Sequence, residues 1–176
     1  MKKLLPLFTA LLAWPAIGAE YTLEKFWASM PTGEKQIGNM HGDIAVSSKN
    51  EVYVSVQGGP KAGVQVYDNK GDYLRNVPNA PNDFHGFVIR KTESGEHLYG
   101  PRLGGQNILK LTLDGKVVLD IKPDSVPAKF KRNGRMRLTG MDVAPNGDLF
   151  VVDGYSTDYI HHFDKAGKYI LSLIHI

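Results

Sequence analysis

The feature that most constrains the fold is a stretch of sequence that recurs three times along the chain. Its copies run from His41 to Leu74, from His85 to Leu119 and from Gly140 to Ile170. The first two copies begin 44 residues apart (41 to 85). Periods of this size are typical of repeat architectures, in which each unit buries its faces against its neighbours.

Each copy contains four short runs rich in Val, Ile, Leu, Tyr and Phe, separated by turn sequences such as Asn69-Lys70-Gly71 and Asp114-Gly115. Gly and Asn supply the positive φ that two-residue β-turns need. Each unit is therefore predicted to be a four-stranded antiparallel sheet, and the all-β chain to be a β-propeller. We place the blades at about residues 40–76, 84–120 and 138–174, with an insertion over 120–136. A three-repeat solenoid and a β-sandwich are the alternatives.

Residues 1–19 have the layout of a secretory signal: two lysines, an apolar stretch and then small residues. A membrane anchor is the alternative reading, but Pro6 and Pro15 enclose an apolar run of only 8 residues, whereas a helix needs about 20 to span a bilayer. We expect cleavage of this leader and export to the periplasm or the outside of the cell. The rest of the chain, residues 20–176, then forms the propeller without a membrane span.

Composition excludes several classes of protein. The chain of 176 residues is 42% apolar, which is too high for a disordered chain. It has no Cys, which excludes disulfides, zinc-thiolate sites and thiol nucleophiles. If the leader with Lys2 and Lys3 is removed, 19 of the 21 basic residues remain, against 18 acidic residues. This near balance argues against a nucleic-acid partner.

The third copy carries a more specific pattern. Residues 141–155 read MDVAPNGDLFVVDGY, and residues 160–164 read IHHFD. This pattern resembles a blade of the NHL-repeat family, and its Asp153-Gly154-Tyr155 step is similar to that of the peptidyl-α-hydroxyglycine α-amidating lyases. The resemblance implies a six-bladed propeller, of which this chain holds about three blades. It also implies a zinc ion in the central channel, held by histidines that open the inner strands of different blades.

The resemblance places one such histidine at His85 and places Tyr155 beside the metal, where a phenolate would take the proton of the substrate hydroxyl. His41 occupies the same position one repeat earlier, so the inner strands would direct both imidazoles toward one axis. Zinc is the predicted ion because imidazole is one of its preferred ligands, and calcium is the second candidate. The family's substrate-contacting arginine falls near Gln57, and Arg102 is the candidate to replace it, since guanidinium binds carboxylate.

Three other groups of residues carry charge or titratable side chains. His161 and His162 fall in the third strand of the last copy, and we expect them on a solvated outer strand away from the axis. The insertion ends in a basic run over 129–137, which either rims a pocket for an anionic substrate or is a solvated loop. Asp153 is expected to order its turn rather than to catalyse.

These observations lead to two hypotheses from different classes. The first is an exported zinc-dependent lyase that cleaves a peptidyl-α-hydroxyglycine-like substrate into an amide and glyoxylate. The second is a non-catalytic extracytoplasmic propeller that binds a peptide, a glycan or a protein. A lactonase-like hydrolase is a weaker reading, because its metal sites use carboxylates and Asn and no such cluster stands out. Three blades cannot close a ring, so we interpret the chain as a fragment, with residues 172–176 foreign to it.

Overall fold

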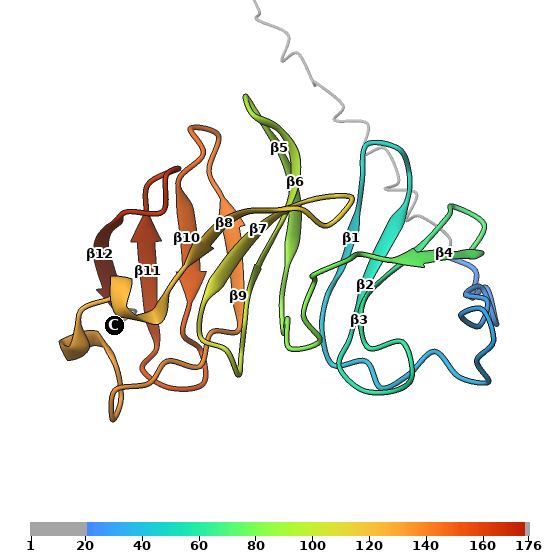
Figure 1. Ribbon diagram of the computed structural model, residues 1–176, viewed down its shortest axis with the longest axis horizontal. Coiled ribbons are helices and arrows are strands. Elements are labelled where there is room, and N and C mark those ends of the chain that lie inside the picture. Colours follow the sequence, from blue (N-terminus) through green and yellow to red (C-terminus); the bar gives the residue numbers. More distant parts are fainter. Residues whose placement is uncertain (1–20, 175–176) are drawn as a thin grey trace, which may run out of the picture.

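The computed structural model describes residues 21–174, and the chain there forms three four-stranded antiparallel sheets (Figure 1). The predicted leader over 1–19 lies outside the described residues. In each sheet the strands follow one another in sequence order, as tight turns between neighbouring strands require. The all-β fold class is confirmed, and the three sheets are arranged as the blades of a propeller.

Each sheet corresponds to one repeat of the sequence: it ends within one residue of the predicted end of its blade and begins two to four residues after the predicted start. The first contains β1 (Ile44–Val46), β2 (Val52–Val56), β3 (Gly63–Tyr67) and β4 (Tyr73–Asn76). The second contains β5 (Val88–Thr92), β6 (Gly95–Pro101), β7 (Ile108–Thr112) and β8 (Val117–Ile121). The third contains β9 (Gly140–Val143), β10 (Leu149–Val152), β11 (Tyr159–Phe163) and β12 (Tyr169–Ile174). The insertion holds two single-turn 3₁₀ helices, η1 (Pro123–Ser125) and η2 (Ala128–Phe130).

Two apolar layers hold the sheets together face to face. Between the first and second sheets, Tyr53 and Val64 are fully buried against a group that includes Leu98 and Leu111. Between the second and third sheets, the corresponding layer includes Tyr99, Ile108, Val151 and Phe163. Successive residues of a strand point to opposite faces, so each sheet contributes alternate residues to the layers on its two sides.

The other face of the first sheet is covered by the segment 27–37 that precedes it. Trp27 and Ile37 pack against the side chains of Val54, Val56 and Tyr67. At the β3–β4 turn, the carbonyl of Gly71 accepts a hydrogen bond from the backbone N–H of Ser29 at 2.7 Å. In the second sheet, the equivalent Gly115 carbonyl accepts one from the Asn79 side chain at 3.0 Å. The segment 27–37 therefore takes the place that a preceding blade would occupy.

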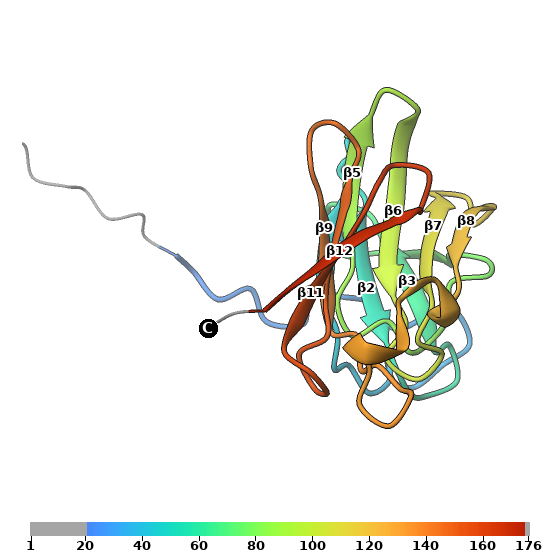
Figure 2. The same ribbon diagram turned by 90° about the vertical axis from the view of Figure 1, so that its left-hand side faces the viewer.

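The two faces of the third sheet differ in what covers them. Figure 2 views the molecule from the side on which this sheet lies. One face packs on the second sheet and on the insertion, where the Phe130 ring lies against the rings of Tyr159 and Tyr169. The opposite face carries Phe150 and Ile160 and continues onto β12, where Leu173 is 48% exposed. Within residues 21–174, no segment covers this second face. In the same part of the chain, no helix is long and apolar enough to cross a membrane.

Candidate functional site

The structure brings His41, His85 and Tyr155 together at one end of the sheets. His41 precedes β1, His85 precedes β5 and Tyr155 follows β10, and in this fold these three strand ends lie on the same side. The His41 and His85 rings are 5.0 Å apart between centroids, and the His85 and Tyr155 rings are 5.1 Å apart. Residues separated by 114 positions in the sequence (41 to 155) thus form one cluster, as the repeat register predicts.

Two hydrogen bonds fix the orientation of the His85 ring. Nδ1 lies 3.0 Å from the backbone carbonyl oxygen of Thr139, and Nε2 lies 3.0 Å from the hydroxyl of Tyr155. A carbonyl only accepts, so Nδ1 of the neutral imidazole carries the hydrogen and donates it. Nε2 then accepts the hydrogen bond from the Tyr155 hydroxyl. An Nδ1–H held by a backbone carbonyl is the arrangement that commonly orients a metal-binding histidine.

The glycine after His85 allows this close approach. A Cβ atom at Gly86 would lie 2.7 Å from the Thr139 carbonyl oxygen, which is closer than real Cβ contacts. A Cβ atom at Gly42, after His41, would likewise lie 2.6 Å from the Cβ of Ser55. The repeated His-Gly step therefore has a structural reason: the glycine lets the start of each inner strand lie against the neighbouring backbone.

Tyr155 is held by the turn in which it lies, while its phenol ring stays accessible. The turn is organised by Asp153, which is completely buried and accepts hydrogen bonds from the backbone N–H of Arg137 at 2.7 Å and from the hydroxyl of Thr157 at 2.7 Å. This confirms the expectation that Asp153 orders the turn. Tyr155 itself is 54% exposed, so a ligand can reach its hydroxyl from solvent.

The cluster fits part of a zinc coordination shell. Imidazole nitrogens are ligands that zinc prefers, and protein zinc sites usually have three or four protein ligands. His41 and His85 supply two imidazoles, but the described residues 21–174 contain no group of three or more His, Cys, Asp and Glu side chains able to hold a metal. A zinc ion here would need at least one further ligand beyond these two imidazoles.

Arg102 does not join this cluster. Its Nε donates to the Asp83 carboxylate at 2.8 Å, and its guanidinium packs so closely over Gly105 that a Cβ there would lie 2.6 Å from Cζ. The ion pair ties the loop after β6 to the segment before β5. In this structure Arg102 has a clear structural partner, and its role toward a substrate stays a prediction.

A cleft opens at the same end as the His-Tyr cluster, with a volume of about 350 Å³. Gln57 lines it, and the Gln57 side chain also donates to the His41 carbonyl at 2.7 Å. The basic run over 129–137 divides here: Arg135 and Arg137 line the cleft, whereas the Lys131 side chain is only 8% exposed. The run is thus partly a pocket rim and partly buried, so neither expectation described all of it.

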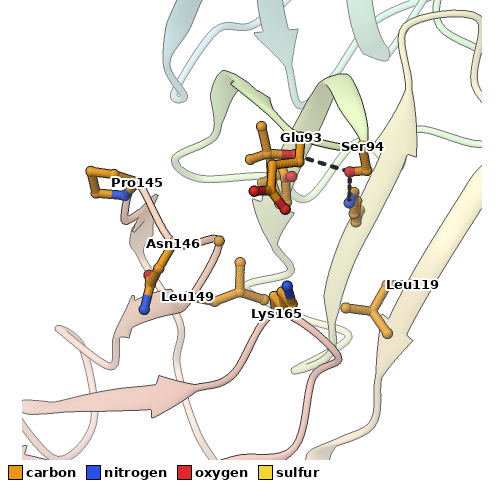
Figure 3. Close-up of a pocket in the computed structure, with 11 residues that line it drawn as sticks. Glu93, Ser94, Leu119, Pro145, Asn146, Leu149 and Lys165 are labelled. Atoms are coloured by element: carbon orange, nitrogen blue, oxygen red, sulfur yellow. Dashed lines mark hydrogen bonds between the residues drawn. The ribbon is translucent and has the colours of Figure 1, made fainter.

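A second cavity, of about 240 Å³, lies at the opposite end of the blades (Figure 3). It lies between the turn that joins β5 to β6 and the turn that joins β9 to β10, and Glu93 and Asn146 are among its lining residues. The Ser94 hydroxyl there is 3.0 Å from the Thr92 hydroxyl and accepts from the Lys110 amine at 3.0 Å. No histidine lines this cavity, and it does not include the residues of the cluster.

The expectation of a solvated outer strand was wrong for His161. Its side chain is completely buried, because the second sheet and the insertion pack over that face of β11. Nδ1 lies 2.8 Å from the Ser172 hydroxyl, while Nε2 has no partner within residues 21–174. Burial lowers the pKa of His161. His162, on the other face, is half-buried and stacks on Phe150, and its hydrogen bond to Asp148 lowers the pKa of that carboxyl group.

Sequence reasoning missed two groups that shape this end of the molecule. The Thr139 carbonyl orients His85, and Asp83 holds both Arg102 and the backbone N–H groups of Gly104 and Gly105. Thr139 precedes Gly140 at the position that a histidine occupies in the first two copies. This departure from the repeat is the one sequence signal that could have drawn attention to Thr139. A backbone carbonyl leaves no trace in the residue type, so its role emerges only from the fold.

Comparisons with known proteins support the fold and identify neither a family nor an activity. No protein-family model matches the sequence, and no curated protein matches it. Among solved structures, the chain is similar to a hydrazine synthase of Kuenenia stuttgartiensis, with a TM-score of 0.57 and 15% identity over 84% of this chain and 40% of that one. It is also similar to a protein from Lactobacillus plantarum, with a TM-score of 0.52 and 15% identity over 76% and 41% of the two chains. The chain thus spans about two fifths of the length of either structure, and the likeness supports the propeller fold alone.

Proposed function

We propose that this chain is part of an exported NHL-type propeller that uses zinc and Tyr155 to cleave a peptidyl-α-hydroxyglycine-like substrate into an amide and glyoxylate. The observation that supports this proposal is the 3.0 Å contact between His85 Nε2 and the Tyr155 hydroxyl. It places a phenol hydroxyl within hydrogen-bond distance of an imidazole nitrogen. That pairing suits a reaction in which a hydroxyl group must be bound and deprotonated.

Each residue of the cluster has a distinct role in this proposal. His85 offers the Nε2 lone pair because Nδ1–H is committed to the Thr139 carbonyl, and His41 offers a second imidazole 5.0 Å away. Zinc, when bound, supplies Lewis-acid chemistry and favours the charged form of a nearby phenol. The Nε2 lone pair of His85 would hold such an ion in place of the Tyr155 hydrogen bond, and the Tyr155 phenol would then be available for proton transfer.

The proton and electron balance of the cleavage is simple. Tyr155, as phenolate, takes the proton of the substrate hydroxyl, and the electrons of that O–H bond form the aldehyde carbonyl of glyoxylate. The bond between that carbon and the amide nitrogen breaks, and the nitrogen takes up a proton to give the amide. No oxidant or reductant is needed.

The second candidate function is non-catalytic recognition of a peptide, glycan or protein. The open cleft beside the cluster favours it, because Arg135 and Arg137 are exposed and can contact a ligand without any chemistry at His85. The two candidates differ in what they require of the metal, so zinc content separates them.

The test measures zinc by elemental analysis in the purified protein and in the variants His85→Ala, His41→Ala and His162→Ala. We expect His85→Ala to lose its zinc and His41→Ala to contain less zinc than the unmodified protein. The variant His162→Ala, which removes a histidine distant from the cluster, should retain its zinc. Unchanged zinc in His85→Ala would overturn the metal site.

Catalysis is tested separately, by glyoxylate release from an N-acyl-α-hydroxyglycine. Replacing Tyr155 with Phe should lower the rate by about 100-fold or more without removing zinc, because it deletes only the group that takes the proton. A zinc-loaded protein without glyoxylate release would favour the binding module.

A further inference from the structure

The cleft beside the His-Tyr cluster has a lining that the proposed lyase chemistry does not use. Its walls come from the loop after β2 at Gln57, from the segment before β5 at Asn82 and Asp83, and from Arg135 and Arg137 of the insertion. A volume of about 350 Å³ is within the range of small-molecule sites.

The local structure of the insertion places both arginines at this cleft. Arg132 and Arg135 pair through two backbone hydrogen bonds of 3.0 Å around Asn133 and Gly134, whose φ values are 51° and 72°. Two positive φ values are typical of a type I′ turn, which reverses the chain tightly. Beyond the turn, Met136 is 2% exposed and points into the core, so alternation along the extended chain places Arg135 and Arg137 on the outer side.

The backbone that carries the two arginines is fixed on both sides. The N–H of Met136 donates to the Gln106 side chain at 2.8 Å, and the N–H of Arg137 donates to the buried Asp153 carboxylate at 2.7 Å. The Ser156 hydroxyl also donates to the Arg135 carbonyl at 3.4 Å. The positions from which the guanidinium groups project are therefore set before any ligand arrives, which reduces the entropy lost on binding.

The charge of the cleft is positive because its one lining carboxylate is already engaged. Asp83 accepts from Arg102 Nε at 2.8 Å through one oxygen and from the N–H groups of Gly104 and Gly105, at 3.2 and 2.9 Å, through the other. Across residues 21–174, neither Arg135 nor Arg137 forms an ion pair. Two exposed guanidinium groups thus lie at one cleft with their donors open.

We infer that this cleft binds the oxyanion group, carboxylate or phosphate, of a small ligand through Arg135 and Arg137. A planar guanidinium presents paired N–H donors that match two oxygens of either group, and such charge-assisted bonds are among the strong ones. The site needs no metal, and the side chains that bind the ligand are not those of the His-Tyr cluster. Its test measures binding alone, without zinc or turnover, so its failure can be distinguished from failure of the proposed lyase.

The test titrates the purified protein at low salt with two probes, N-acetylglycine as a carboxylate and methyl phosphate as a phosphate, by isothermal calorimetry. Binding of either probe is expected, and the probe that binds more tightly identifies the source of the oxyanion. The double variant Arg135→Gln/Arg137→Gln should weaken that binding by about tenfold or more.

The control is Arg132→Gln, compared with each of the single variants Arg135→Gln and Arg137→Gln as well as with the double variant; it removes one positive charge from the same hairpin, and Arg132 does not line the cleft. It should change affinity by less than about twofold, as expected for a screened surface charge. Thermal unfolding checks that the exposed replacements leave the fold intact. Absence of binding by both probes, or equal weakening in the control, would overturn the site; removal of metal by a chelator should leave probe binding unchanged.

Discussion

Equivalent faces of the first and third sheets lie in two different environments. Tyr53 and Phe150 are each the second residue of their sheet's second strand, and Val64 and Ile160 are each the second residue of the third strand. Tyr53 and Val64 are fully buried, whereas Phe150 and Ile160 are partly exposed. The residues are equally apolar at both places. The difference is that the second sheet packs on the first, while nothing within residues 21–174 packs on this face of the third.

The opposite faces of the same two sheets are both covered, but by different material. The segment 27–37 covers the first sheet, and the second sheet together with the insertion covers the third. The middle residues of the third strands, Gln65 and His161, are both completely buried there. Burial of a repeat position thus depends on the neighbour that the fold supplies and not on the strand alone.

The largest expected effect comes from truncating the equivalent aromatic residues. Tyr53→Ala should lower the free energy of unfolding by about 4 kcal/mol, because it leaves a cavity in a closed layer. Phe150→Ala should lower it by about 1 kcal/mol, because that ring is only partly buried and leaves no closed cavity. Urea denaturation of both variants measures the difference. Equal losses would mean that the third sheet's open face is covered in solution, and the comparison would fail.

The next effect tests whether the segment 27–37 really replaces a blade. In Gly71→Ala, the new Cβ would lie 1.8 Å from the Trp27 carbonyl oxygen at a φ of 91°, so the segment must move away. We expect a loss of about 3 kcal/mol, from strain and overpacking together. The control is Gly134→Ala, where φ is 72° and nothing lies within 4 Å, so only the backbone strain of about 1 kcal/mol remains. Denaturation midpoints that match in the two variants would contradict this role of the segment.

The smallest effect is a pH dependence of the free energy of unfolding, which arises from one buried histidine in the second sheet and one in the third. Burial lowers the pKa of His161 and of His97, so the unfolded chain binds more protons than the folded one once the pH falls below the ordinary histidine pKa of about 6.5. The stabilisation is complete above that pH and decreases as the pH falls toward 5, before the carboxylates titrate.

Replacing His161 with Gln, the residue at the equivalent place in the first sheet, should reduce this loss of stability between pH 7 and pH 5. Urea midpoints across that range measure it, and the remaining slope should disappear when His97 is also replaced. A wild-type midpoint that does not fall toward pH 5 would contradict the assignment of these two buried histidines.

Much of the arrangement of the candidate cluster could be predicted from the sequence, because it depends on repeat register. His41 and His85 open equivalent strands, and Tyr155 follows a strand end, so a shared architecture brings them to one end of the sheets. Arg102 shows the limit of this reasoning. Its position after the second strand was predictable, but its pairing with Asp83, 19 residues away, depends on two loops that only the packed sheets bring together.

The sequence by itself determined the strands, their turns and the repeat that arranges them, because turn chemistry and alternation act between residues close along the chain. Only the tertiary structure decided which faces are buried, which carbonyl orients His85 and which arginines remain available in the cleft. These outcomes depend on what lies across from each side chain. That neighbour is set by packing between distant segments, and the residue's own type does not encode it.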